Sequence, residues 1–134
     1  MRYVFILFFL LIIIHVSFSQ NYRTINTVSV RLLKIYKKGD QAYKENQYAL
    51  AEKYFKKTIQ IDNHFIDSYI KLASINFELE KYNEAIKYFQ NVLGLDSFYN
   101  NKIYYTQALT YYKIKNYEKA KASMEIYLFN EKEN

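Results

Sequence analysis

Few side chains in this sequence could carry out chemistry. There is no cysteine, so neither a thiolate nucleophile nor a disulfide can form. Outside the apolar N-terminal run the only histidine is His64, in a predicted loop, whereas a metal site usually needs three or four ligands. Glu78 and Glu80 point to different sides of a predicted helix, and Glu52 stands four residues from Lys56, the spacing of a surface ion pair. We therefore expect no active site, no metal and no cofactor, and a protein that is not an enzyme.

Residues 1–19, MRYVFILFFLLIIIHVSFS, have the layout of a secretory signal peptide. Arg2 precedes the unbroken apolar run Tyr3–Ile14, and small residues at Ser17 and Ser19 mark a cleavage site before Gln20. Twelve helical residues rise only about 18 Å, less than the roughly 30 Å hydrocarbon core of a bilayer. We expect a cleaved leader and export to the periplasm or cell envelope. An uncleaved membrane anchor is the alternative, and a buried first helix fits poorly because the run is apolar on all sides.

The mature chain is mildly basic. The whole sequence has 19 Lys and Arg against 13 Asp and Glu, so losing Arg2 with the leader leaves 18 against 13, or about +5. The basic residues are dispersed, as at Lys37-Lys38 and Lys56-Lys57, which favours a solvated helix surface. Weak attraction to an acidic partner or an anionic surface is the alternative. Nucleic acid is not expected, because the leader directs export and no groove-reading motif is present.

Helices are the expected structure from residue 30 onward. The absence of proline and the presence of only two glycines favour helices over a turn-rich sheet. Apolar residues recur at spacings of three and four in each predicted helix. The predicted helices are Val30–Glu45, Tyr48–Ile61, Phe65–Leu79, Tyr82–Leu93, Lys102–Lys113 and Tyr117–Phe129. Residues 20–31 are expected to comprise a flexible polar lead-in, which ends at Val28, followed by the start of the first helix.

A repeated pattern organises these helices. The stretch Gly39–Asp62 returns 34 residues later as Ala73–Asp96 and again, one residue late, as Ala108–Glu131. The matching positions hold small residues (Gly39, Ala73, Ala108), aromatics (Tyr48, Tyr82, Tyr117), alanines (Ala51, Ala85, Ala120) and large apolar residues (Phe55, Phe89, Met124). Two antiparallel helices can approach closely only where side chains are small, so the small residues predict the helix contacts. A period of this length indicates a helical solenoid.

These residues resemble the tetratricopeptide repeat (TPR) family over roughly Leu32–Phe129. The resemblance implies an all-α solenoid of helix-turn-helix repeats, with three antiparallel helix pairs in a right-handed superhelix. The TPR domain would span 32–134, with repeats at about 32–65, 66–99 and 101–134. The sequence departs from the family where Trp is usual (Ile35, Tyr69, Tyr104) and where Pro usually follows the second helix (Asn63, Ser97).

The resemblance also implies a binding groove. In TPR proteins the first helix of each pair lines a concave groove that accepts an extended peptide or a helix. The positions that face this groove hold Tyr36, Tyr43, Ile70, Lys71, Phe77, Lys102, Tyr105, Leu109 and Tyr112. Aromatic residues suit protein interfaces. Tyr36, Tyr105 and Leu109 are the more telling, because the family's packing often places an aromatic at the positions of Tyr43, Phe77 and Tyr112. Lys71 is expected to attract an acidic group.

One known groove type is not expected. TPR domains that bind chaperones hold a C-terminal carboxylate with Lys, Asn and Arg side chains. The corresponding positions here are Tyr36, Asp40, Lys71, Lys102 and Thr106. Only Lys102 fits, and Asp40 would repel a carboxylate.

Two functions follow from these observations. TPR arrays usually end with an extra helix that covers the last apolar face, whereas NEKEN follows Phe129 here. The first function is an exported module that binds a peptide or protein segment in its groove, as part of a cell-envelope assembly or a secretion or motility complex. For such a module only an uncleaved leader would contact the membrane. The alternative is a structural subunit that self-associates weakly through Tyr127, Leu128 and Phe129.

Overall fold

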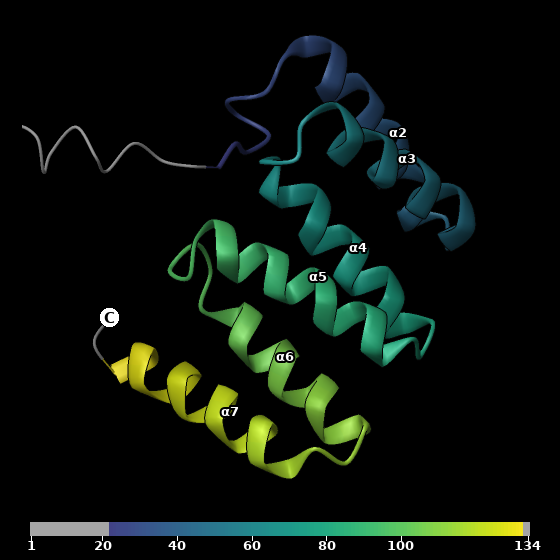
Figure 1. Cartoon of the computed structure of the whole chain (residues 1–134). Coiled ribbons are helices and arrows are strands. Elements are labelled where there is room, and N and C mark those ends of the chain that lie inside the picture. Colours follow the sequence, from purple (N-terminus) through teal and green to yellow (C-terminus); the bar gives the residue numbers. More distant parts are fainter. Residues whose placement is uncertain (1–21, 133–134) are drawn as a thin grey trace, which may run out of the picture.

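Six α-helices follow one another in a single row in the computed structural model of the chain, which describes residues 22–132 (Figure 1). The helices are α2 (Val30–Lys44), α3 (Tyr48–Ile61), α4 (Ile66–Glu78), α5 (Tyr82–Leu95), α6 (Lys102–Lys113) and α7 (Tyr117–Lys132). Every predicted helix is confirmed, with ends that differ by three residues at most. The all-α helical fold is confirmed as well. The predicted signal peptide lies outside the described residues.

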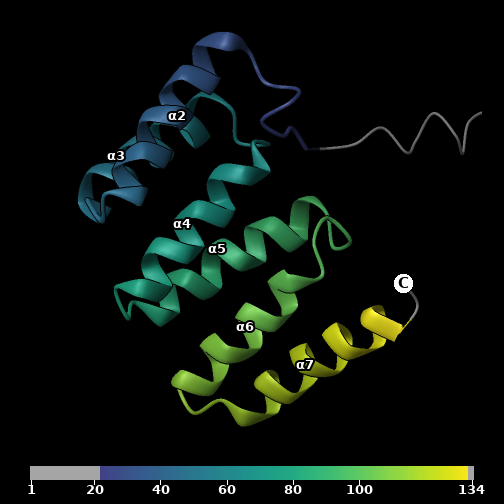
Figure 2. The same cartoon turned by 180° about the vertical axis from the view of Figure 1, so that it is seen from behind.

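The helices form antiparallel pairs, α2 with α3, α4 with α5 and α6 with α7, and the view from behind shows the same succession (Figure 2). Each pair turns at a residue in the left-handed backbone region, with φ of 58° at Asn46, 57° at Glu80 and 61° at Lys115. In the first turn Gln47 N–H donates to the carbonyl of Ala42 at 2.8 Å, and the other two turns repeat this bond. This is the Schellman motif, which satisfies the last carbonyls of the first helix. The same turn therefore recurs in all three pairs.

Small residues mark the helix contacts, as the repeat pattern predicts. Ala51, Ala73 and Ala85 are completely buried. At Gly39 the approach is too close for a larger side chain, because an added Cβ would lie 2.9 Å from Cε1 of Phe55. Gly39 thus allows α2 and α3 to pack directly against each other.

The core continues from one pair to the next. Ile66 and Ala73 of α4, Phe89 of α5 and Ile103 of α6 belong to one buried apolar cluster. Between α3 and α4, the buried hydroxyl of Thr58 lies 2.6 Å from that of Ser68, so the polar groups at this junction satisfy each other. The array is therefore one continuous body of stacked pairs, as expected for a solenoid.

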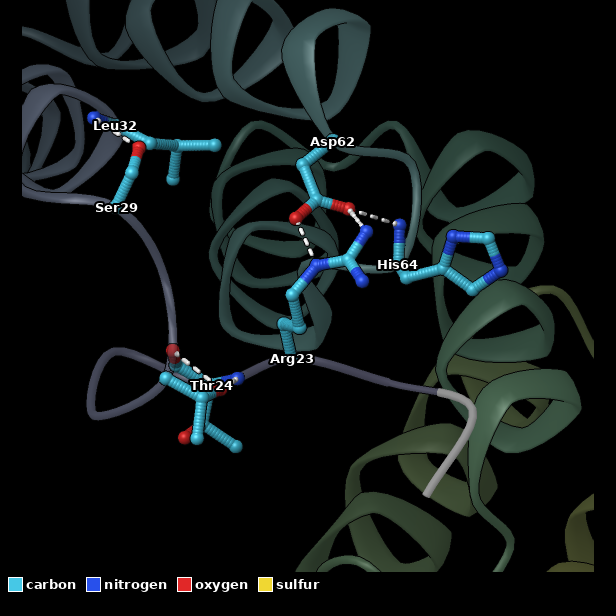
Figure 3. A network of polar contacts seen from close by, with 7 residues as sticks. Arg23, Thr24, Ser29, Leu32, Asp62 and His64 are labelled. Atoms are coloured by element: carbon cyan, nitrogen blue, oxygen red, sulfur yellow. Dashed lines mark hydrogen bonds and ion pairs between the residues drawn. The ribbon is translucent and has the colours of Figure 1, made fainter. Parts of the chain in front are cut away.

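The segment before α2, predicted to be a flexible lead-in, contacts the second helix pair. Residues 22–28, here called the N-terminal strap, pack against the loop between α3 and α4 (Figure 3). The Arg23 guanidinium pairs with Asp62, with Nη2 2.6 Å from Oδ1. The Arg23 backbone N–H donates to the carbonyl of His64 at 2.7 Å, and its carbonyl accepts from Ile66 N–H at 2.9 Å. These contacts are long-range and mostly involve the backbone, so residue types alone do not reveal them, and the flexibility of the segment stays a prediction.

The strap also reaches the loop between α5 and α6. The ring of Tyr22 meets that of Tyr99 edge-on, with centroids 5.3 Å apart. The Tyr99 hydroxyl lies 3.2 Å from Oδ1 of Asp67, whose Oδ2 accepts the backbone N–H of Ile25 at 2.7 Å. Burial nevertheless raises the pKa of the Asp67 carboxyl above its usual value. The strap therefore ties together the loops on either side of the second helix pair.

Candidate partner-binding groove

The predicted groove residues lie on α2, α4 and α6, and the structure joins those of α2 and α4 directly. Nζ of Lys71 on α4 lies 2.7 Å from Oδ1 of Asp40 on α2, whose Oδ2 lies 2.8 Å from Nζ of Lys44. The Lys71 ammonium also stands 5.1 Å above the ring of Tyr43. Lys44 and Lys71 together hold the pKa of the Asp40 carboxyl below its usual value. This half of the surface is a compact ionic cluster.

That Lys71 attracts an acidic group of a partner stays a prediction, and within the chain the acidic group beside Lys71 is Asp40. Asp40 compensates the charge of Lys71, and a ligand carboxylate would meet Asp40 as well as Lys71. The sequence carried a signal for this pair, because Asp40 and Lys71 fall on first helices of consecutive repeats, which pack side by side. The ionic half of the surface therefore offers hydrogen-bonding groups and little net charge.

The predicted groove residue Tyr36 packs against aromatic side chains of α3 and of the loop before α4. Its ring packs between those of Phe55 and Phe65, at centroid distances of 5.3 and 5.2 Å. Burial raises the pKa of the Tyr36 hydroxyl well above its usual value. Tyr36 therefore serves the packing of the first pair against the next, which is a structural role.

The other aromatic positions pack within their own helix pairs, as the family's pattern implies. The ring pairs are Tyr43–Tyr48 at 5.7 Å, Phe77–Tyr82 at 5.7 Å and Tyr112–Tyr117 at 5.6 Å between centroids. Tyr43 and Phe77 are half-buried, whereas Tyr112 remains 62% exposed. A packing role is thus confirmed for all three, and only Tyr112 also offers a large accessible surface.

The accessible apolar part of the predicted groove is on α6. Tyr105, Leu109 and Tyr112, here called the α6 aromatic stripe, follow one another at spacings of four and three and so share one helix face. Tyr105 is 42% exposed and rests against Tyr127 of α7, with ring centroids 5.4 Å apart, while Leu109 is half-buried. Lys102 is exposed one turn before the stripe. Of the candidate residues, only Lys71 forms an ion pair with another of the described residues 22–132.

Among residues 22–132 no three His, Asp or Glu side chains gather closely enough to hold a metal ion. His64 is half-buried in its loop, where its backbone N–H donates to Asp62 Oδ1 at 3.0 Å. Within the same range no helix has the length and apolar character needed to cross a membrane. The arrangement offers surfaces for contact with another chain.

Comparison with known proteins agrees with this architecture. Residues 66–99 and 102–125 match the family profile described as tetratricopeptide repeat, and the first helix pair lies outside this match. No curated protein sequence is significantly similar to the chain.

Several solved structures share the fold. The first TPR of Spaghetti (RPAP3), bound to the HSP90 peptide SRMEEVD, is 24% identical with a TM-score of 0.72, over 80% of this chain and 84% of that one. The Arabidopsis OM64 TPR domain is 22% identical with a TM-score of 0.70, over 78% and 85%. A chain of the CopN–Scc3 complex is 21% identical with a TM-score of 0.70, over 75% and 59%. Residues 66–99 and 102–125 are therefore similar to tetratricopeptide repeats, and the chain has an all-α helical repeat fold.

Proposed function

We propose that this protein is an exported adaptor that binds a segment of another protein along the surface formed by α2, α4 and α6. Tetratricopeptide repeats are typical of protein–protein interaction, and the similar structures include one bound to a peptide. The observation that carries the proposal is the α6 aromatic stripe, where Tyr105 and Tyr112 leave 42% and 62% of their surface exposed. Tyrosines of this kind provide large contact area at little cost in conformational entropy and are enriched at interfaces.

The chemistry of the surface constrains the partner. Apolar or aromatic side chains would pack on the α6 aromatic stripe, and Lys102 beside it would favour an acidic residue next to them. The HSP90 peptide of the Spaghetti complex is no guide to the ligand here, because Asp40 and Lys71 neutralise each other. A segment that spans three first helices set about 8–10 Å apart covers some 20 Å, or about six extended residues. We expect micromolar affinity, since ordering so short a segment opposes binding.

Capture of the partner from an envelope extract, followed by affinity measurements on variants, tests the proposal. Tyr112→Ala should weaken binding about tenfold, as for a central interface tyrosine, while lowering stability by no more than the roughly 0.5–1.5 kcal/mol of its ring pair with Tyr117. Lys102→Glu should weaken the binding and reverse its salt dependence. Phe98→Ala is the matched control, since Phe98 is 86% exposed in the loop between α5 and α6. Parent-like binding by both Tyr112→Ala and Lys102→Glu would show that the partner uses another face.

Export is the second part of the proposal, and it rests on the leader sequence. We expect cleavage between Ser19 and Gln20, which would leave two residues before the N-terminal strap begins at Tyr22. The intact mass of the exported protein distinguishes the two fates of the leader. A membrane-bound species that still carries residues 1–19 would identify the leader as an anchor. Co-purification of the protein with an envelope assembly would support its role in a secretion or motility complex.

A further inference from the structure

The three repeats allow α7 to be compared position by position with its equivalents α3 and α5. At three positions on the outer face, α3 has Lys53, Lys57 and Gln60, α5 has Lys87, Asn91 and Gly94, and α7 has Ala122, Ile126 and Phe129. All nine residues are exposed. The α7 residues, here called the α7 outer stripe, lie at spacings of four and three and so share one face. Since α3 and α5 pack with no large apolar residue at these positions, the fold does not require the stripe.

Apolar surface continues from this stripe onto the end of the array. Leu128 of α7 is 51% exposed, and Phe129 beside it is 65% exposed. Of the twelve large apolar side chains that are exposed among residues 22–132, six lie on α6 and α7. These six are Tyr105, Tyr112, Tyr117, Ile126, Leu128 and Phe129. The α6–α7 end is therefore the apolar end of the molecule.

The opposite end is basic. On α2, five basic residues (Arg31, Lys34, Lys37, Lys38, Lys44) outnumber one acidic residue (Asp40), for a net charge of +4. On α7, three lysines (Lys119, Lys121, Lys132) balance three glutamates (Glu118, Glu125, Glu131), for a net charge of zero. Lys34 and Lys38 stand where the next repeat has Ser68 and Leu72, both completely buried. The two ends of the array thus differ in both charge and polarity.

We propose that a second copy of this chain docks on the α7 outer stripe, giving a closed two-fold dimer in which the apolar ends meet and the basic ends point away from each other. Head-to-tail stacking would bury Lys34 and Lys38 against apolar surface, which is costly for unpaired charges. Contact between two α2 helices would bring together two surfaces of like charge. Contact between two α7 helices is electrically neutral and covers apolar surface on both copies.

The order of residues on α7 suits an antiparallel pairing. In such a pair the small Ala122 lies opposite the large Phe129 of the second copy, and Ile126 lies near the Ile126 of the second copy. Phe129 then has a small residue to pack over, and the two Ile126 side chains pack against each other. A two-fold contact uses the same patch on both copies, so the assembly closes at two and does not grow into a filament. The dimer would carry two copies of the groove and could hold a partner with two binding segments more tightly than one copy could.

Sedimentation of the purified protein over a wide concentration range tests the dimer. We expect reversible dimerisation, and we expect Phe129→Lys to raise the dimer Kd at least tenfold while leaving Tm unchanged. Phe98→Lys is the matched control, since Phe98 is 86% exposed but lies in the loop before α6. A parent protein that remains monomeric at millimolar concentration would overturn the proposal. So would equal weakening by Phe129→Lys and Phe98→Lys.

Disulfide trapping tests the arrangement of the two copies, and the absence of native cysteine makes any introduced thiol unique. Under mild oxidation Ile126→Cys should cross-link to itself between copies, whereas Lys38→Cys should not. A mixture of the two variants should give only the Ile126→Cys homodimer. A mixed cross-link that exceeds this homodimer would instead establish head-to-tail stacking.

Discussion

Replacing Gly39 with alanine tests the close contact of α2 with α3, because two effects of known size oppose each other there. Alanine is the better helix former by about 1 kcal/mol, so propensity alone would stabilise α2. The new methyl group, however, would lie 2.9 Å from Cε1 of Phe55 and 3.1 Å from Cβ of Tyr54. Phe55 is completely buried and packs on Tyr36, and Cβ of Tyr54 is fixed to the α3 backbone. Overpacking of this kind typically costs about 1–3 kcal/mol.

The balance favours destabilisation. A cost near the middle of that range, less the gain in propensity, leaves a net loss of about 1 kcal/mol for Gly39→Ala. Ala73 and Ala108 occupy the same position in the later repeats, which shows that a helix pair can accommodate the methyl group by opening slightly. Gly94 is the matched control, because it is exposed on α5 with nothing within 4 Å of an added Cβ. Gly94→Ala should therefore stabilise the protein by up to about 1 kcal/mol.

Urea unfolding followed by circular dichroism measures both variants. They should differ by about 2 kcal/mol and, with Tm shifting about 4 °C per kcal/mol, by about 8 °C in thermal melts. The opposite signs are what matters, because the two substitutions are chemically identical and both positions are helical. If Gly39→Ala stabilises the protein as much as Gly94→Ala does, then α2 and α3 are not in direct contact at this point.

Two further predictions concern the repeat register and the N-terminal strap. Ala85→Leu should overpack the completely buried contact of α4 with α5 and lower the free energy of unfolding by about 1–3 kcal/mol. Lys87→Leu, at an exposed position, should change it by less than about 0.5 kcal/mol. Equal shifts of the two variants in urea unfolding would contradict the repeat register. The Arg23 guanidinium holds the pKa of the Asp62 carboxyl below its unfolded value, so this stabilisation is present above the unfolded pKa and is lost as pH falls through the folded pKa. Melts of the parent protein from neutral pH to about pH 3 should therefore show an acid-side loss that is smaller in Asp62→Asn, and identical slopes would mean that the ion pair does not stabilise the fold.

The helices could be predicted from sequence because each carries its own signal. The period of 34 residues predicts where the helices of a pair touch, and the buried Ala51, Ala73 and Ala85 confirm these contacts. The turns within the helix pairs also lie where the predicted helices leave room for them. The residue types of Glu80 and Lys115 do not favour a left-handed backbone, however. In these turns the geometry is imposed by the helices on either side.

The strap and much of the groove could not be predicted in the same way. The strap is held by backbone hydrogen bonds between Arg23 and residues some forty positions away, and no side-chain pattern encodes such pairing. The ring of Tyr36 packs against Phe65, which comes from the following repeat, and the binding role of Tyr36 stays a prediction. The candidate residues on α6 remain predictions, since what they contact depends on a partner.

Because the strap fastens the first helix pair to the second, the array should come apart from its α6–α7 end. In a repeat array each unit is held mainly by its neighbours, so both terminal pairs are weaker than the middle one. Arg23 adds an ion pair and two backbone hydrogen bonds at the first junction, and these contacts make the first helix pair harder to detach than the last. Native-state hydrogen exchange would then proceed through partial openings in which α7 frays before α2 and α3. A chain that covers α7 would therefore lower the frequency with which α7 detaches and the array partly unfolds.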